Sequence, residues 1–370
     1  MELKVRALTY HIAARNLGEW NKSEIREEVE NAVGTLEDLK RVIEKEAGIE
    51  VWTTRIAMPV PPSRLSLMEV AQTILELVDD KHLASIGGLY SSDPRLRQLC
   101  EIAQQGLFAH IIVREKDRLG DIARLLYQWS SETPESMTRL GVEFSRGEIL
   151  TPYFPLSRTP LDYTSNTITM AFLYVSKAKR ELTARGVYGL ERYLQSLARR
   201  LGGIAREHLE NWASKAVFGG FDFSLSPWME ESVARLLEDY GGCELEGGGC
   251  INTAHEINSS LARAGANGCA TGFNEIMLPV GEDDLLKEKA RSGRLRVRDL
   301  LLYVPVCLAG IDMVAFRASE RKLKLLLESL WSYAVVKKRT VGFRGIAVRP
   351  GEMASEIETK SFGPIPVMEL

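Results

Sequence analysis

The sequence predicts an α/β protein, on the basis of two observations. Apolar, β-rich runs alternate along the chain with stretches that have helical spacing, and about ten such runs can be counted. The chain has 370 residues, of which 45% are hydrophobic and 26% charged, so it can bury a large core. Because alternating strands and helices form βα units with a mostly parallel sheet, a parallel barrel and a wide doubly wound sheet both fit.

Strands and helices alternate regularly in the first half of the chain. The helix at 23–47 has the clearest pattern, because Ile25, Val29, Val33 and Leu36 recur every three or four residues. Predicted strands cover 5–13, 50–60, 83–89, 107–113 and 142–145, and predicted helices cover 23–47, 65–78, 95–103 and 117–128.

The second half is less regular, and it begins after a turn-rich segment at 148–166. This segment is either a seam between two halves or a long functional loop. We expect one domain over residues 1–370, with halves at 1–147 and 167–370 joined by this proline-rich loop. Predicted strands cover 167–175, 218–225, 272–279, 302–316 and 340–348, and predicted helices cover 177–185, 190–217, 230–240, 253–264 and 319–334.

Charge and motifs exclude several classes of function. The formal net charge is −3, so no global basic field draws the chain to nucleic acid or a membrane surface. The sequence begins without an apolar signal segment, and its longest apolar run, 300–311, is too short to span a bilayer, which predicts a cytoplasmic protein. Phosphate-binding loop, zinc protease, α/β-hydrolase and dinucleotide-binding motifs are not found in the sequence.

The five cysteines do not have the spacing of a disulfide framework. Cys243, Cys250, His255 and Cys269 could supply metal ligands, but they lack the two-residue gap of zinc-binding cysteine pairs. A glycine-rich turn with incidental thiols is the simpler interpretation, and we predict no metal site. Asn and Gln are scarce while Glu, Lys and Arg are plentiful, which leans toward a thermophile. In such an organism an intracellular Cys243–Cys250 disulfide can form.

Cys307 and Asp312 are the first candidates for catalysis. Cys307 lies in a very apolar predicted strand, where a thiol is usually inert because burial raises its pKa. Gly310 permits a kink or a close backbone approach. Asp312 places a carboxylate where the pattern expects the core, and buried carboxylates gather at functional sites. A structural role and a functional role both remain open.

Basic and small residues mark a candidate anion-binding site. Arg55 lies within a predicted strand, where it would either face an acidic ligand in a barrel lumen or form an ordinary ion pair. Arg344 lies in the last predicted strand and can point either way. Gly87 and Gly88 would let backbone amides approach a ligand or would simply form a turn. Ser226, before Pro227, suits a helix N-cap and also an anion.

Several segments together resemble a family of proteins known as domain of unknown function 711. These are Phe221-Asp-Phe-Ser-Leu-Ser226-Pro, Pro305-Val-Cys307-Leu-Ala-Gly310-Ile-Asp312-Met, the ending Phe362-Gly-Pro-Ile-Pro-Val-Met, and the earlier Thr54-Arg55-Ile-Ala57 and Ile86-Gly87-Gly88. The resemblance implies a ten-stranded α/β barrel like that of pyruvate formate-lyase and other glycyl radical enzymes. It also implies a small ACT-domain regulatory protein as a partner.

Three functional hypotheses follow. In the first, a non-radical enzyme holds a small anionic metabolite at the barrel centre with Arg55 and Arg344, while Asp312 serves as acid or base and Cys307 as nucleophile or polar lining. In the second, the protein is a metabolite-binding regulator without turnover. In the third it is a glycyl radical enzyme, because Arg339-Thr-Val-Gly342-Phe approaches the glycyl radical motif with its valine displaced. We also expect a homo-oligomer, and no cofactor can be named.

Overall fold

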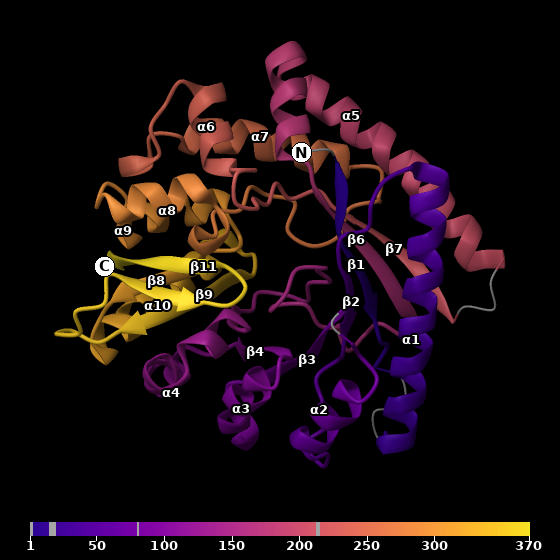
Figure 1. Ribbon diagram of the computed structural model, residues 1–370, viewed down its shortest axis with the longest axis horizontal. Coiled ribbons are helices and arrows are strands. Elements are labelled where there is room, and N and C mark those ends of the chain that lie inside the picture. Colours follow the sequence, from indigo (N-terminus) through magenta and orange to yellow (C-terminus); the bar gives the residue numbers. More distant parts are fainter. Residues whose placement is uncertain (1–2, 15–19, 80, 212–214) are drawn as a thin grey trace.

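The chain folds around one large mixed sheet (Figure 1). The computed structural model describes residues 3–14, 20–79, 81–211 and 215–370 of the chain. The sheet has 11 strands in the order β10-β11-β8-β9-β5-β4-β3-β2-β1-β6-β7. The pairs β1–β6, β5–β9 and β10–β11 are antiparallel, and the other neighbouring strands are parallel. The sheet curls, so that β8, β9 and β11 lie opposite β1, β6 and β7.

The elements have the following bounds. The strands are β1 Lys4–His11, β2 Thr54–Ala57, β3 His82–Tyr90, β4 Phe108–Val113, β5 Leu140–Phe144, β6 Asn166–Leu173, β7 Ala216–Asp222, β8 Ile311–Arg317, β9 Val341–Val348, β10 Glu356–Thr359 and β11 Gly363–Glu369. The helices are α1 Lys22–Val42, α2 Leu67–Leu75, α3 Leu99–Gln104, α4 Leu119–Glu132, α5 Val175–Asn211, α6 Val233–Gly241, α7 Ile251–Ala264, α8 Asp284–Arg291, α9 Val297–Tyr303 and α10 Glu320–Lys337.

The sheet is not closed, so the predicted ten-stranded barrel is not confirmed. Strands β10 and β7 form its two edges, and no strand pairing joins them within the described ranges. A closed barrel would need every strand to have two neighbours in the ladder. The C-terminal hairpin of β10 and β11, which the sequence analysis did not predict, extends the sheet at the β8 edge.

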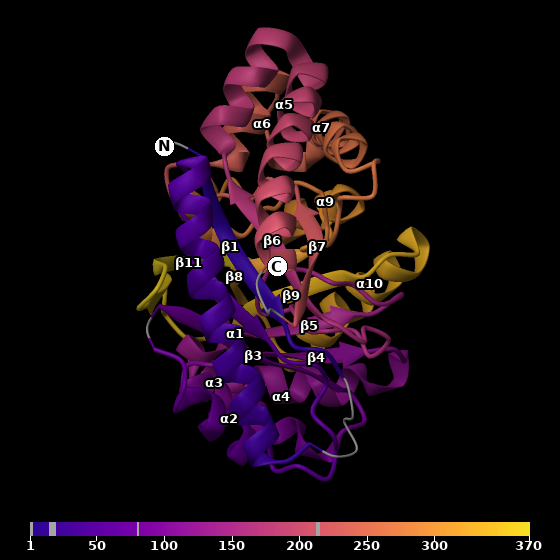
Figure 2. The same ribbon diagram turned by 90° about the vertical axis from the view of Figure 1, so that its right-hand side faces the viewer.

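Helices cover the outer side of the sheet and pack their apolar faces against it. Helix α1 begins at a capping box, in which Asn21 accepts from the backbone of Glu24 and Glu24 accepts from the backbone of Asn21. Its buried face carries Ile25, Val29 and Leu36, as the periodicity predicts. Helices α1 and α10 lie at opposite sides of the molecule, and α5 and α7 pack against each other (Figure 2). None of the described helices is long and apolar enough to cross a membrane.

In the second half, one predicted strand was wrong and another was correct only in its last part. Residues 272–279 form no strand and make only an isolated bridge at Ile276. The apolar segment 302–316 is divided, because α9 and a short turn of 3₁₀ helix precede β8. Pro305 lies in this short helix, where its missing N–H costs nothing at the first turn. Helix α5 contains a kink at Gly186, which matches the two helices predicted there.

Residues 150–160 of the proline-containing segment 148–166 are buried and form an interior segment, whereas residues 161–165 are exposed. Arg158 in this segment is fully buried and pairs with Glu143 of β5 at 3.2 Å and with Glu148 at 2.5 Å. The carbonyl of Pro155 accepts a hydrogen bond from His110 of β4. These contacts anchor Pro155 and Arg158 to the neighbouring strands β4 and β5. The division of the chain into two halves at this segment stays a prediction.

Candidate functional site

A cavity of about 440 Å³ lies where this interior segment meets the strands. Its lining includes Arg6 of β1, Arg55 of β2, Asp312 of β8 and Arg344 of β9, together with Tyr153 from the interior segment. This volume lies in the range of sites for small organic ligands. Buried charged side chains that line such a cavity need a partner of opposite charge, because burying an isolated charge is costly.

Arg344, Asp312, Glu282 and Arg6 form a continuous chain of ion pairs. The parallel register of β8 and β9 pairs Asp312 with Arg344, so their side chains meet on one face. Arg344 donates from Nε to Asp312 Oδ1 at 2.6 Å and from Nη2 to Glu282 Oε1 at 2.7 Å. Arg6 donates from Nη2 to Glu282 Oε2 at 2.6 Å. Arg6 and Arg344 therefore both have carboxylate partners.

The two carboxyl groups of this chain respond differently to burial. Burial raises the pKa of Glu282, but the charges of Arg344 and Arg6 lower it by more. The pKa of Glu282 therefore lies below the ordinary value for a glutamate. For Asp312 burial is the stronger effect, and its pKa lies above the ordinary value despite Arg344. Asp312 is therefore the member of the chain that takes up a proton most readily.

Arg55 differs from the three other arginines of the lining, Arg6, Arg139 and Arg344, because no carboxylate pairs with it in the described ranges. It donates from Nε to Thr53 Oγ1 at 3.0 Å and from Nη1 to the Pro152 carbonyl at 3.3 Å. Its guanidinium lies 5.3 Å from the centre of the Phe154 ring. Burial, together with the charge of Arg6, lowers the pKa of Arg55 to about 9, so the side chain remains a cation at neutral pH.

Hydroxyl groups connect Arg6 to the interior segment. Ser226 Oγ accepts from Arg6 Nη1 at 3.2 Å and lies 3.1 Å from Tyr153 Oη. Arg6 Nη1 also donates to the Pro227 carbonyl, whereas the buried Arg6 Nε has no hydrogen-bond partner within the described chain. Burial raises the pKa of Tyr153 far above its usual range, so its hydroxyl stays protonated.

The predicted site residues fall into two groups. Arg55, Ser226, Asp312 and Arg344 all line the cavity, although they come from distant parts of the chain. Cys307, Gly310, Gly87 and Gly88 are not among the lining residues. His11, also noted for its position, is buried and lies 2.8 Å from Thr169 Oγ1, and burial lowers its pKa to about 3.

The three glycines have packing roles in the structure. A Cβ atom at Gly88 would lie 2.4 Å from His110 Nε2, so only glycine leaves room for this ring. Gly87 has φ +80° and lies against the carbonyls of Met58 and Pro59. Gly310 has φ +70°, and a Cβ there would lie 2.0 Å from the Gly342 carbonyl oxygen. These contacts account for all three glycines without a ligand.

Cys307 lies in the turn between α9 and β8 rather than inside a strand. It is 1% exposed, and burial raises its pKa to about 12. The nearby Glu275, which pairs with Lys337 and Arg339, adds to this shift. The thiol is therefore protonated at neutral pH, and a thiol of this kind is a poor nucleophile.

Four features of the site were not predicted from the sequence: Arg6, Glu282, Tyr153 and the aromatic residues of the lining. Arg6 could have been identified from the sequence, because it is a single arginine within an apolar predicted strand, as Arg55 is. Glu282 lies in the short helix Val280–Glu282 just before α8, and no local pattern marks it. Tyr153 and Phe154 belong to the interior segment, and the sequence does not show which path this segment takes through the fold.

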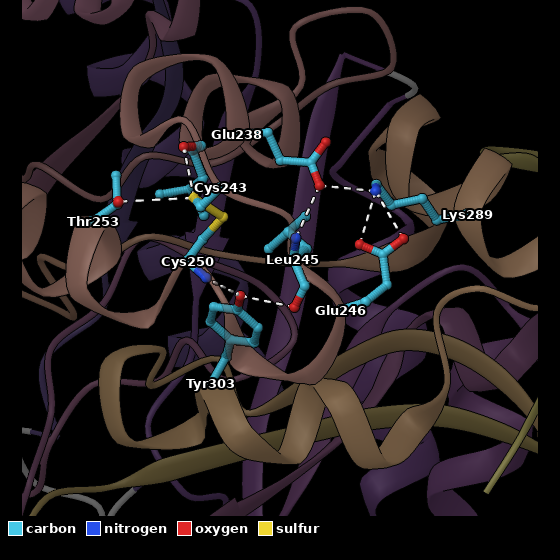
Figure 3. The surroundings of a disulfide bond; sticks show 9 residues. Glu238, Cys243, Leu245, Glu246, Cys250, Thr253, Lys289 and Tyr303 are labelled. Atoms are coloured by element: carbon cyan, nitrogen blue, oxygen red, sulfur yellow. Dashed lines mark hydrogen bonds and ion pairs between the residues drawn. A yellow bond between two sulfur atoms is a disulfide. The ribbon is translucent and has the colours of Figure 1, made fainter.

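Cys243 and Cys250 form a disulfide that closes the loop between α6 and α7 (Figure 3). Tyr303 of α9 accepts from the Cys250 backbone and donates to the Leu245 carbonyl. Lys289 of α8 pairs with Glu246 at 2.9 Å and with Glu238 at 2.8 Å. The loop therefore connects α6, α8 and α9. These helices lie close to Glu282 or Asp312 in the sequence. No cluster of potential metal ligands is found among the described residues.

Comparisons with known proteins reveal one family. A family model described as "Uncharacterised ACR (DUF711)" matches residues 121–358, which include Ser226, Glu282, Asp312 and Arg344. Arg6 and Arg55 precede the matched region.

Several curated proteins are similar to this chain. A UPF0210 protein of Lactiplantibacillus plantarum is 23% identical over 269 residues, which are 68% of this chain and 59% of that protein. A UPF0210 protein of Campylobacter concisus is 29% identical over 146 residues, 37% of this chain and 32% of that protein. One of Sulfurisphaera tokodaii is 27% identical over 154 residues, 40% of this chain and 35% of that protein. The chain thus spans less than two thirds of the length of these relatives.

Proposed function

The chain belongs to the uncharacterised DUF711 family, and from this premise and the geometry of the cavity we propose that it binds a small organic anion, with Arg55 as the principal cation. Arg6 and Arg344 are held by Glu282 and Asp312 and serve as a rigid charged wall. The ligand enters the space between this wall and the interior segment, beside Phe154.

The open guanidinium of Arg55 carries this proposal. Arginine has five N–H donors, and the hydrogen bonds to Thr53 and Pro152 use two of them. The three remaining donors are the second N–H of Nη1 and both N–H groups of Nη2. One N–H from each nitrogen can bind the two oxygens of a carboxylate. Glu282 and Asp312 pair with Arg6 and Arg344, and Arg139 of the lining pairs with Glu135, so Arg55 is left without a carboxylate partner among the described residues.

Burial explains why an anion would bind tightly at this position. Arg55 is only 8% exposed, and a buried cation without a counter-ion loses hydration free energy. A bound carboxylate restores that interaction in a cavity with low local dielectric, where a charge-assisted hydrogen bond is stronger than in water. The arginine is also held in place beforehand by its two hydrogen bonds and by Phe154, which lowers the entropic cost of binding.

A catalytic role rests on Asp312 as a second candidate function. Its carboxyl group lines the cavity and its pKa is raised by burial, so it could give or take a proton from a bound anion. Cys307 does not support a nucleophilic mechanism, because the thiol lies outside the cavity lining and its pKa is about 12. Incubation of any bound ligand with wild type and Asp312→Asn, followed by mass analysis, separates turnover from binding alone.

Thermal-shift measurements with a panel of small carboxylates and phosphates test the proposal. The variants are Arg55→Gln and, as a matched control, Arg349→Gln. Arg349 is an exposed arginine that stacks on Tyr127 outside the cavity. A ligand at 100 times its dissociation constant should stabilise wild type by about 2.7 kcal/mol. We expect this shift in wild type and Arg349→Gln but not in Arg55→Gln. An equal shift in all three proteins would rule out Arg55 as the anion-binding residue.

A further inference from the structure

The lining of the cavity is unusually aromatic. Eight of its 32 residues are Phe, Tyr or Trp, whereas these types make up 8% of the whole chain. An aromatic share about three times the average is typical of sites that bind flat apolar groups, because aromatic side chains offer large, rigid contact area. The eight are Trp52, Phe108, Tyr153, Phe154, Trp228, Phe273, Phe343 and Phe362.

These rings flank the charged groups on two sides. On the Arg6 side, Trp228 contacts Trp52 with ring centres 4.8 Å apart and Phe362 with centres 5.9 Å apart. On the Arg55 side, Phe154 contacts Phe108 with centres 5.0 Å apart. Trp52, Trp228, Phe108 and Phe362 remain partly exposed, in contrast to the fully buried aromatic core. Apolar surface left open to a cavity gains free energy when a ligand covers it.

The charges of the cavity select a single anionic group. Arg55 is the one arginine of the lining without a carboxylate partner among the described residues, because Arg139 pairs with Glu135 at 3.5 Å and the donors of Arg6 and Arg344 that face Glu282 and Asp312 are already engaged. A second anionic group on the ligand would approach these two carboxylates and be repelled. A dicarboxylate, a tricarboxylate or a phosphate dianion is therefore disfavoured relative to a monocarboxylate.

From these observations we infer that the ligand is a monocarboxylate joined to an aromatic ring, with the carboxylate on Arg55 and the ring between the aromatic side chains. This inference rests on the proposed function and narrows it to one class of ligand. The cavity volume of about 440 Å³ accommodates one ring or two fused rings with a short acidic side chain.

Calorimetric titration with matched compounds tests the class. The probes are 3-phenylpropanoate, its uncharged amide, hexanoate and succinate. We expect wild type to bind 3-phenylpropanoate about tenfold more tightly than hexanoate, because stacking adds to area burial. Succinate and the amide should bind more weakly still. If succinate binds most tightly and the binding depends on Arg55, the aromatic class is wrong while the proposed function stands. If no probe binds, both are wrong.

Variants of the aromatic wall give an independent readout. Trp228→Leu and Phe362→Leu should each reduce the preference for 3-phenylpropanoate over hexanoate by about threefold to tenfold. Trp331→Leu is the control, because this tryptophan lies on α10 and contacts Arg146 outside the cavity. The unliganded melting temperature of each variant shows whether it is folded, and two wall variants keep the test open if one is not. An unchanged preference in both folded wall variants would overturn the inference.

Discussion

At the scale of single residues, three of the four arginines that line the cavity are buried, and these three differ in their partners. Arg344 and Arg6 share Glu282, and Arg344 also holds Asp312, whereas Arg55 has a hydroxyl and a carbonyl. A paired arginine stabilises its surroundings because its removal strands a buried carboxylate. An unpaired buried arginine has the opposite tendency, and proteins commonly keep such groups for function.

This difference predicts opposite outcomes for two similar substitutions. Arg344→Gln should lower the free energy of unfolding by about 3 kcal/mol or more, because it leaves Asp312 and one oxygen of Glu282 buried without a cation. Arg55→Gln should change it by less than about 1 kcal/mol, because no buried anion loses its partner. Urea denaturation of the unliganded proteins measures both. Equal losses in the two variants would contradict the assignment of partners.

Glu143 provides a test of acid stability. Burial raises its pKa, but His110 and Arg158 lower it by more, to about 2, against 4.5 for an ordinary glutamate. The folded state thus holds this proton less tightly than the unfolded state, so the stabilisation is complete above pH 4.5 and is lost as the pH falls toward 2. We expect this loss to reach about 3 kcal/mol in wild type and to be absent from Glu143→Gln. Unfolding free energies measured from pH 2 to 6 should therefore have a steeper slope in wild type, and parallel curves would contradict the account.

Cys307 should be unreactive in the folded protein. Its thiol is 1% exposed with a pKa of about 12, whereas Cys269 is partly exposed. Iodoacetamide at pH 8, followed by peptide mass analysis, should modify Cys269 but leave Cys307 intact until denaturant is added. Modification of Cys307 at the rate of Cys269 would show that the thiol is accessible and restore it as a candidate nucleophile.

At the scale of elements, the disulfide-closed loop between α6 and α7 stabilises the packing of the neighbouring helices. The eight residues from Cys243 to Cys250 contact α8 through Lys289 and α9 through Tyr303. Loop-closure entropy for a ring of this size corresponds to about 2.5 kcal/mol. The double substitution of both cysteines by serine should therefore lower the free energy of unfolding by about this amount. Reduction of wild type should have the same effect, and an unchanged urea midpoint after reduction would contradict it.

Most elements could be predicted from the sequence, because each carries its own periodicity. The strands and helices of the first half all exist near the predicted ranges. The errors lie in segments without a clear period, either because they are apolar throughout or because they contain proline. Residues 302–316 are apolar throughout, and a run of this kind does not distinguish a buried helix from a strand, so α9 was missed. The hairpin of β10 and β11 contains Pro364 and Pro366, which normally argue against a strand.

At the scale of the whole molecule, the order of the strands decides which residues meet. Arg55 and Arg344 were predicted as anion-binding residues from their places in strands, and they do line one cavity. The partners of Arg344 could not be predicted, because Glu282 lies outside any regular strand and Asp312 meets Arg344 only through the register of β8 and β9. The predicted barrel was not confirmed, because closure depends on pairing at the sheet edges rather than on local pattern.

The most direct test of the central claim is a crystal structure of the protein with the carboxylate that stabilises it most in the thermal-shift panel. The account predicts that a carboxylate oxygen lies within hydrogen-bond distance of Arg55 Nη2, inside the cavity lined by Phe154 and Tyr153, with the ion pairs of Arg344 intact. An anion bound at exposed basic residues such as Lys338 and Arg339, with Arg55 unengaged, would contradict it.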